Sequence, residues 1–261
     1  MANKNILLIE PGYKNKYPPL GLMKLAAYHG PYGKKDNVKF IKGDQDRSVN
    51  SVNWDRIYIT TLFSFEWKEI AKSVDSAIAI VRGDTTRVFV GGIAASLMHD
   101  KFIAEPRWRG VRFISGLLSS SPSESLQLDD FAEELYSDDF SGTPIEDLVP
   151  DYSILDQIRD QYIYPVHDAY FAYASRGCVR KCHFCGVPKL EGNQRDAQSI
   201  TVLIRAIEER HGAKRDLMLS CRFRMYHQWE KRQESLLKYQ QRSCPFFKFN
   251  MNARHKTLAA P

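Results

Sequence analysis

Long hydrophobic runs are absent from this sequence. No uninterrupted apolar stretch approaches the ~20 residues of a membrane-spanning helix, so we expect no membrane partner. The beginning, Met1 to Ile6, lacks the apolar core of a secretory signal, which predicts a cytoplasmic location. Cysteine is scarce, with five residues in a chain of 261, so a disulfide framework is not expected. A hydrophobic content of 43% and a charged content of 26% are typical of soluble globular proteins.

Acidic residues are scarce in the last part of the chain. From Ser220 to Pro261 there are nine Lys/Arg and two Asp/Glu, so this segment accounts for the formal net charge of +6. The remainder is close to neutral. A nucleic-acid partner is therefore not expected, because such proteins usually carry basic charge over a folded surface. The sequence predicts an atypical basic tail over 220–261.

Short apolar runs alternate with helical patterns in the first part of the chain. This order favours a parallel sheet covered on both faces, so 1–118 is expected to form an α/β, Rossmann-like domain. Ligands of such sheets bind at the carboxyl ends of the strands. Strands are expected at 5–10, 38–41, 56–61, 87–92 and 111–116, helices at 21–28, 66–81 and 93–99, and candidate ligand loops at 11–21, 60–65 and 91–94.

The segment 119–165 has a different composition. It opens with S-S-S-P-S and continues with an acidic run between Asp129 and Asp139. This composition indicates a connector between domains, with short helical pieces and a solvated acidic face. We therefore expect an acidic linker here, and no metal site.

Three cysteines within eight residues are the most informative feature of the sequence. The segment Ser175–Gly186 reads S-R-G-C-V-R-K-C-H-F-C-G, which places Cys178, Cys182 and Cys185 at C-x3-C-x2-C spacing. A structural zinc site needs four protein ligands, and an ordinary cubane iron–sulfur cluster needs four cysteines. Three thiols would leave one metal position open, where a substrate or cofactor binds.

Two further interpretations concern the ligands of this site. Cys221 or Cys244 could complete a four-cysteine zinc site with the three loop cysteines. His183 also lies inside the loop, but the cysteines already occupy the metal face. We therefore interpret His183 as a variable loop residue.

The cysteine loop stands between elements that suggest the start of a barrel. Strands are expected at 169–174 and 216–219, and a helix at 196–210 between them. A strand, a loop, a helix and a second strand form the first βα unit of a barrel, and the loop would then lie on the functional face. The segment 166–219 is therefore expected to begin a partial (β/α) barrel.

The cysteine spacing, the aromatic residue before the third cysteine and the preceding S-R-G resemble the signature of the radical S-adenosylmethionine (SAM) enzymes. Many members with this loop have proline where this chain has Val179. The resemblance implies that Cys178, Cys182 and Cys185 bind a four-iron four-sulfur (4Fe-4S) cluster. SAM would chelate the fourth iron and be cleaved reductively to a 5′-deoxyadenosyl radical.

The resemblance also implies the surroundings of the cluster. Phe184 would lie against the adenine edge of SAM, and Gly186 would let the loop wrap tightly around the cofactor. The electron would come from a donor such as flavodoxin or ferredoxin. The substrate would be a small molecule or a peptide, and no residue identifies it.

The first domain resembles the cobalamin-binding-like domain that precedes the barrel in one branch of these enzymes. The likeness rests on the order of elements and on the turn at Gly91-Gly92. Cobalamin binders of that fold often carry D-x-H-x-x-G after the first strand, where this chain has E-P-G-Y-K-N from Glu10. The alternatives are cobalamin without an axial histidine, loss of the cofactor, and a purely structural sheet that turns at the glycines.

The barrel pattern does not continue. An eight-unit barrel takes ~250 residues, so a six-unit partial barrel would need roughly 180 by the same scaling, and residues 186–261 are too few. Residues 220–261 show neither strand alternation nor a clean helical stripe, and the apolar cluster at Pro245–Phe247 has no evident partner. The pattern predicts a truncated barrel with an out-of-frame C-terminus, and a dedicated basic docking tail is the alternative.

Three functional hypotheses follow from the sequence. The first is a radical SAM enzyme whose substrate is unknown. The second is a catalytically inactive iron–sulfur fragment with the same loop. The third is a zinc-binding or metal-free module in which the Rossmann-like domain binds a ligand.

Overall fold

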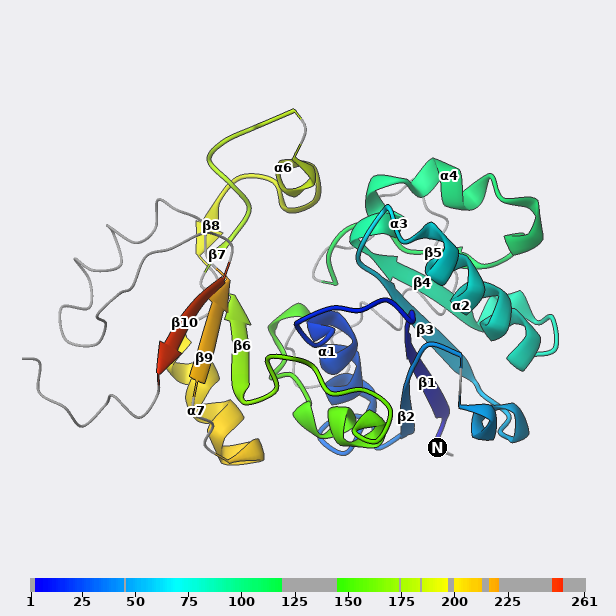
Figure 1. Ribbon diagram of the computed structural model, residues 1–261, viewed down its shortest axis with the longest axis horizontal. Coiled ribbons are helices and arrows are strands. Elements are labelled where there is room, and N and C mark those ends of the chain that lie inside the picture. Colours follow the sequence, from blue (N-terminus) through cyan, green and yellow to red (C-terminus); the bar gives the residue numbers. More distant parts are fainter. Residues whose placement is uncertain are drawn as a thin grey trace, which may run out of the picture. The chain divides into compact units, whose positions relative to one another are not determined.

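The computed structural model divides the chain into two compact units, Met1–Pro165 and Val166–Pro261 (Figure 1). Each unit contains its own sheet. The structure describes residues 3–44, 46–118, 145–173, 175–183, 185–196, 200–212, 216–220 and 246–250.

The first unit is built on a five-stranded, all-parallel sheet. Its strands lie in the order β2-β1-β3-β4-β5. The prediction of a parallel α/β fold is therefore confirmed. The strands are β1 (Asn5–Glu10), β2 (Asn37–Lys42), β3 (Arg56–Thr61), β4 (Val88–Gly92) and β5 (Arg112–Phe113).

Both faces of the parallel sheet are buried, because the helices that connect its strands cover them. In β1, Leu7 and Ile9 belong to a core cluster with α2 (Trp67–Ile80), whereas Ile6 and Leu8 are equally buried on the opposite face. The second face is covered by α1 (Leu20–His29), which packs on β1, β2 and β3. Strands buried on both faces carry continuous apolar runs, which is the pattern that the sequence shows.

The helix expected at 93–99 is interrupted. The structure has two short helices, α3 (Ile93–Leu97) and α4 (His99–Ile103), because Met98 leaves helical geometry with φ −119° and ψ 33°. Three 3-10 helices complete this part of the unit: η1 (Arg47–Ser51), η2 (Thr85–Arg87) and η3 (Pro106–Trp108).

The expected linker is part of the first unit from residue 145 onward. Its 3-10 helices η4 (Ile145–Asp147) and η5 (Tyr152–Ile158) bury apolar side chains against α1 and β2. The Gln157 side-chain amide accepts a hydrogen bond from Phe40 N–H (2.8 Å), so it covers the free edge of β2. The acidic run of the predicted linker lies outside the described residues.

The second unit contains the expected strand, loop, helix and strand. β6 (Ala169–Tyr173) pairs in parallel with β9 (Asp216–Ser220), and α7 (Ile200–His211) joins them. The helix begins four residues later than predicted, because Arg195–Asp196 forms the short strand β8, which pairs with β7 (Ser175–Arg176). A short helix, α6 (Gly186–Glu191), lies inside the cysteine loop.

The tail contributes a strand that the sequence did not reveal. β10 (Phe246–Asn250) pairs antiparallel with β9, with Phe247 opposite Leu219, and gives the sheet order β10-β9-β6. The expectation that the apolar cluster at Pro245–Phe247 lacks a partner was therefore wrong for its two phenylalanines. The pattern was missed because a single five-residue strand carries too few alternations to stand out.

The helices of both units are short. Among the residues that the structure describes, no helix is long and apolar enough to cross a membrane.

Candidate functional site

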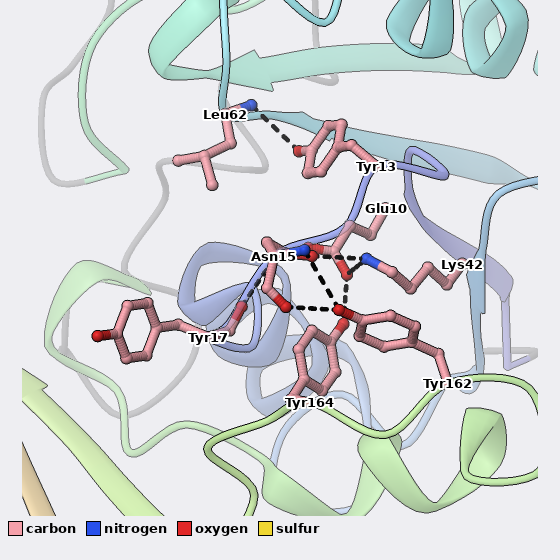
Figure 2. A network of polar contacts seen from close by, with 8 residues as sticks. All are labelled: Glu10, Tyr13, Asn15, Tyr17, Lys42, Leu62, Tyr162 and Tyr164. Atoms are coloured by element: carbon pink, nitrogen blue, oxygen red, sulfur yellow. Dashed lines mark hydrogen bonds and ion pairs between the residues drawn. The ribbon is translucent and has the colours of Figure 1, made fainter.

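The first polar cluster lies at the carboxyl ends of β1 and β2 (Figure 2). Glu10 and Lys42 are the last residues of these strands, lie opposite each other in the sheet and form an ion pair of 2.8 Å. The Asn15 side chain bridges both residues. Its Nδ2 donates to Glu10 Oε1 (2.8 Å), and its Oδ1 accepts from Lys42 Nζ (2.8 Å). The Tyr164 hydroxyl donates to Glu10 Oε2. All the polar atoms of this Glu10 cluster find partners within the chain.

Burial controls the electrostatics of the Glu10 cluster. It raises the pKa of Glu10, against the opposing effect of Lys42 and the hydrogen bonds from Lys42, Tyr164 and Asn15. It also lowers the pKa of Lys42, against the opposing effect of Glu10. The ammonium group lies 4.5 Å from the centre of the Tyr162 ring, so a cation–π contact further compensates its loss of water.

The loop after β1, one of the expected ligand loops, is packed against other segments of the first unit. Tyr13 is buried, accepts a hydrogen bond from Leu62 N–H (3.2 Å) and packs edge-on against Phe63. The Tyr162 hydroxyl donates to the Asn15 carbonyl oxygen (2.6 Å). The loop has no histidine to ligate cobalt, and the buried side chains at its start are engaged with each other. These residues do not fit an axially ligated cobalamin.

The glycine pair at the end of β4 allows the ends of β3 and β4 to approach each other closely. Gly92 has φ 102°, and a Cβ there would lie 2.5 Å from the carbonyl oxygen of Thr61 at the end of β3. The Thr61 hydroxyl donates to the Gly91 carbonyl oxygen (2.8 Å) and accepts from Ala95 N–H (2.9 Å). Among the interpretations of Gly91-Gly92, this geometry favours the structural one. The adjacent loop after β3 presents Phe65, which is 77% exposed.

The second candidate site is the cysteine loop, between β7 and β8 in the second unit. Cys178, Cys182 and Cys185 are half-buried, and none forms a disulfide. Arg180 N–H donates a hydrogen bond to Cys178 Sγ (3.4 Å). No group of three or more His, Cys, Asp or Glu side chains is placed to hold a metal ion among the described residues. The thiols are thus on one loop but not gathered around one point.

The other predicted residues of this loop have different outcomes. Gly186 is half-buried and begins α6 directly after Cys185. Phe184 lies outside the described residues. His183 is exposed.

The neck of the cysteine loop is closed by main-chain contacts. β7 and β8 form an antiparallel pair, and Cys178 N–H donates to the Gly192 carbonyl oxygen (3.2 Å). Gly177 has φ 73°, and a Cβ at this position would lie 2.1 Å from the Asn193 carbonyl oxygen. Only glycine permits this approach. The neck therefore fixes both ends of the segment that carries the three thiols.

A buried arginine connects this neck to the preceding strand. The Arg176 guanidinium lies 3.5 Å from the centre of the Tyr173 ring, at the end of β6. Burial lowers the pKa of Arg176, against the opposing effect of Glu191. Burial, followed by the charge of Glu191, raises the pKa of Tyr173 to about 12. From the sequence, Arg176 in the S-R-G segment could either offset the negative charge of a cluster or be an exposed loop charge. Sequence reasoning did not identify Glu191, which has no motif signal.

Neither site can be assigned by similarity to known proteins. No protein-family model matches the chain, and no curated protein matches it significantly.

Proposed function

We propose that this chain binds a 4Fe-4S cluster through Cys178, Cys182 and Cys185 and reductively cleaves SAM, as a radical SAM enzyme whose substrate is unidentified. The observation that carries the proposal is the three-thiol loop, which directly follows a strand that pairs in parallel with β9. A bound and reduced cluster would supply the electron that cleaves SAM to methionine and a 5′-deoxyadenosyl radical.

The donor set fits such a cluster in kind and number. Three thiolates occupy three iron positions and leave the fourth for SAM, whereas a closed zinc site would need a fourth protein ligand. The Arg180 N–H already points to one sulfur. The exposed side chains of Arg180 and Lys181 add positive charge beside a thiolate-bound cluster, which favours its anionic state.

The remaining roles in the proposal come from the same resemblance. Phe184 would lie against the adenine of SAM, and Gly186 would allow close approach of the main chain to the cofactor. A flavodoxin or ferredoxin would donate the electron, in the cytoplasm, where thiols stay reduced. We derive no step through cobalamin, because the loop after β1 carries no histidine and its buried side chains bind one another.

A catalytically inactive iron–sulfur or zinc-binding fragment is the second candidate. One observation favours it: β10 pairs antiparallel with β9. A (β/α) barrel would continue at this position with another parallel strand. A cavity for a radical reaction must exclude water, and a three-stranded mixed sheet does not by itself enclose one.

Anaerobic reconstitution with iron and sulfide tests the first proposal. We expect four irons per chain by the composition of the cluster, with broad visible absorbance that Cys178→Ala removes. Val179→Ala is the matched control, because Val179 is 52% exposed in the same loop and carries no ligand atom. Dithionite and SAM should then give 5′-deoxyadenosine. A cluster without SAM cleavage supports the inactive candidate, and stoichiometric zinc in place of iron contradicts the radical SAM proposal.

A further inference from the structure

Glu191 links the end of α6 to the neck of the cysteine loop. It is the last residue of α6, the helix that begins directly after Cys185, and its side chain reaches back to the neck. Glu191 Oε2 accepts a hydrogen bond from Gly177 N–H (2.7 Å), the residue before Cys178. One carboxylate therefore connects the main chain beside the first cysteine with the helix that follows the third.

The same carboxylate also binds the buried arginine of the neck. Glu191 Oε1 lies 3.2 Å from Arg176 Nη1, and the two side chains are only 20% and 12% exposed. The Glu191 carbonyl oxygen accepts from Arg195 Nη1 (2.8 Å), on the other strand of the neck. Hydrogen bonds to a charged acceptor at such limited exposure are stronger than neutral ones. Glu191 thus joins both strands of the neck to α6.

We propose that Glu191 is a positioning residue for the three-cysteine site, which fixes both ends of the segment from Cys178 to Cys185 so that its thiols can close around a metal. The assignment rests on the proposed function of the loop in metal binding. In this proposal Glu191 is not a metal ligand. It acts through Gly177 N–H on one side and through α6 on the other, while the thiols between these two points remain able to close around a metal.

The chemistry requires a carboxylate of this length. Both partners, Gly177 N–H and the Arg176 guanidinium, are hydrogen-bond donors. A glutamine would offer one acceptor oxygen and would turn its own N–H group toward a donor, so it can satisfy one partner only. An aspartate keeps both acceptors but shortens the reach by one methylene. Glu191→Gln should therefore lose the positioning of the cysteine loop, whereas Glu191→Asp should keep part of it.

The test uses the whole chain with Cys221 and Cys244 replaced by serine, so that only the loop thiols respond. A trivalent phenylarsenical, which bonds to neighbouring thiols, measures their positioning in the metal-free protein. Iron content and visible absorbance after anaerobic reconstitution measure cluster binding. The variants are Glu191→Ala, Glu191→Gln and Glu191→Asp, with Glu209→Ala as the matched control. Glu209 is an exposed carboxylate on α7.

We expect Glu191→Ala and Glu191→Gln to weaken arsenical binding and cluster retention by about 10- to 100-fold, the usual cost of losing a partner behind a metal ligand. Glu191→Asp should recover part of the loss, and Glu209→Ala should behave as the parent chain does. Circular dichroism identifies any variant that fails to fold, in which case the isosteric Glu191→Gln decides.

The outcomes separate this inference from the proposed function. Unchanged arsenical binding in folded Glu191→Gln and Glu191→Ala would overturn the positioning role, whether or not the chain takes up iron. If the arsenical responds to Glu191 but no variant and no parent chain binds a cluster, the positioning role stands and the radical SAM proposal fails.

Discussion

The ends of β1 and β6 lead into two polar sites with opposite surroundings. At the end of β1, Glu10 and Lys42 are buried and paired, and their hydrogen-bond partners Asn15 and Tyr164 belong to the same unit. Beyond β6, the neck of the cysteine loop is closed by main-chain contacts, while Cys178 and Cys182 between its two strands stay half-buried thiols. The polar groups of the Glu10 cluster are paired within the fold, whereas in the cysteine loop such contacts hold the neck and leave the thiols to a ligand.

This difference indicates which site is available to a ligand. A ligand at the Glu10 cluster would have to replace hydrogen bonds and an ion pair that already compensate for burial, at a large cost in free energy. A ligand at the cysteine loop would gain the sulfur atoms without breaking the neck. Both sites therefore follow the end of a strand. They differ in their hydrogen-bond partners, because the Glu10 cluster is paired within the protein and the cysteine loop offers its sulfur atoms to a metal.

The largest effect is expected from closing the space at the neck. In Gly177→Ala, the new Cβ overlaps the Asn193 carbonyl oxygen and φ of 73° adds strain, so the neck must open. We expect iron retention to fall by well over the roughly tenfold that strain of about 1–2 kcal/mol would cause alone, because the overlap with the Asn193 carbonyl oxygen adds to it. Gly192→Ala is the control, because its φ of 71° brings the same strain but no atom lies near the Cβ. Equal losses in both variants would contradict the importance of the close approach.

Within the first unit, the largest effect concerns the buried ion pair. Lys42→Met leaves Glu10 buried without its partner, so the free energy of unfolding should fall by about 3–5 kcal/mol. Urea denaturation followed by the fluorescence of Trp54 and Trp108, both buried in this unit, measures the change. In Lys39→Met, where the lysine is more exposed and pairs with Asp46, we expect less than about 1 kcal/mol. A small effect in both variants would show that water reaches Glu10.

Removal of one hydroxyl should have an intermediate effect. Tyr164→Phe deletes a hydrogen bond to the buried Glu10 carboxylate, and such bonds contribute about 1.5–3 kcal/mol. Tyr162→Phe deletes contacts to the neutral main chain of Asn15, for which about 0.5–1.5 kcal/mol is expected. The same urea titration compares the two. The reverse order would mean that Glu10 is protonated in the folded state.

The smallest effect is a pH dependence of the first unit. Burial lowers the pKa of His29, against the opposing effect of its hydrogen bond to Asp36 (2.8 Å), and Arg56 and Lys34 lower it further. Below the ordinary value of 6.5, the unfolded chain therefore binds more protons than the folded one. This contribution to stability is present above pH 6.5 and is lost as the pH falls through the folded pKa.

Thermal unfolding at pH 7.5 and 5.5 measures this dependence, which is at most about 1.4 kcal/mol per pH unit for one group. Glu10 has the opposite slope, because burial raises its pKa and its contribution is lost as the pH rises. The difference between the parent chain and His29→Gln isolates the histidine. Identical pH profiles would mean that His29 does not remain neutral when the protein folds.

The sequence was sufficient for elements with a strong local pattern. The apolar runs of β1 and β3 and the stripe of α2 predicted those elements within one residue, because burial on both faces leaves a pattern in consecutive residues. The partners of Glu10 left no such pattern. Tyr164 lies 154 residues from Glu10, and only the fold brings the Tyr164 hydroxyl to the Glu10 carboxylate.

For the candidate metal site, the sequence by itself determined the kind and number of the candidate ligands, because the C-x3-C-x2-C spacing confines three thiols to one loop. Only the tertiary structure decided how that loop is held. The contacts of Gly177 with Asn193 and of Glu191 with Gly177 join residues 14 to 16 positions apart across a loop, not along one helix or strand, so no local sequence pattern reveals them. It also decided that Glu10 is a structural residue, because burial and distant partners, not residue type, determine whether a carboxylate is available to a ligand.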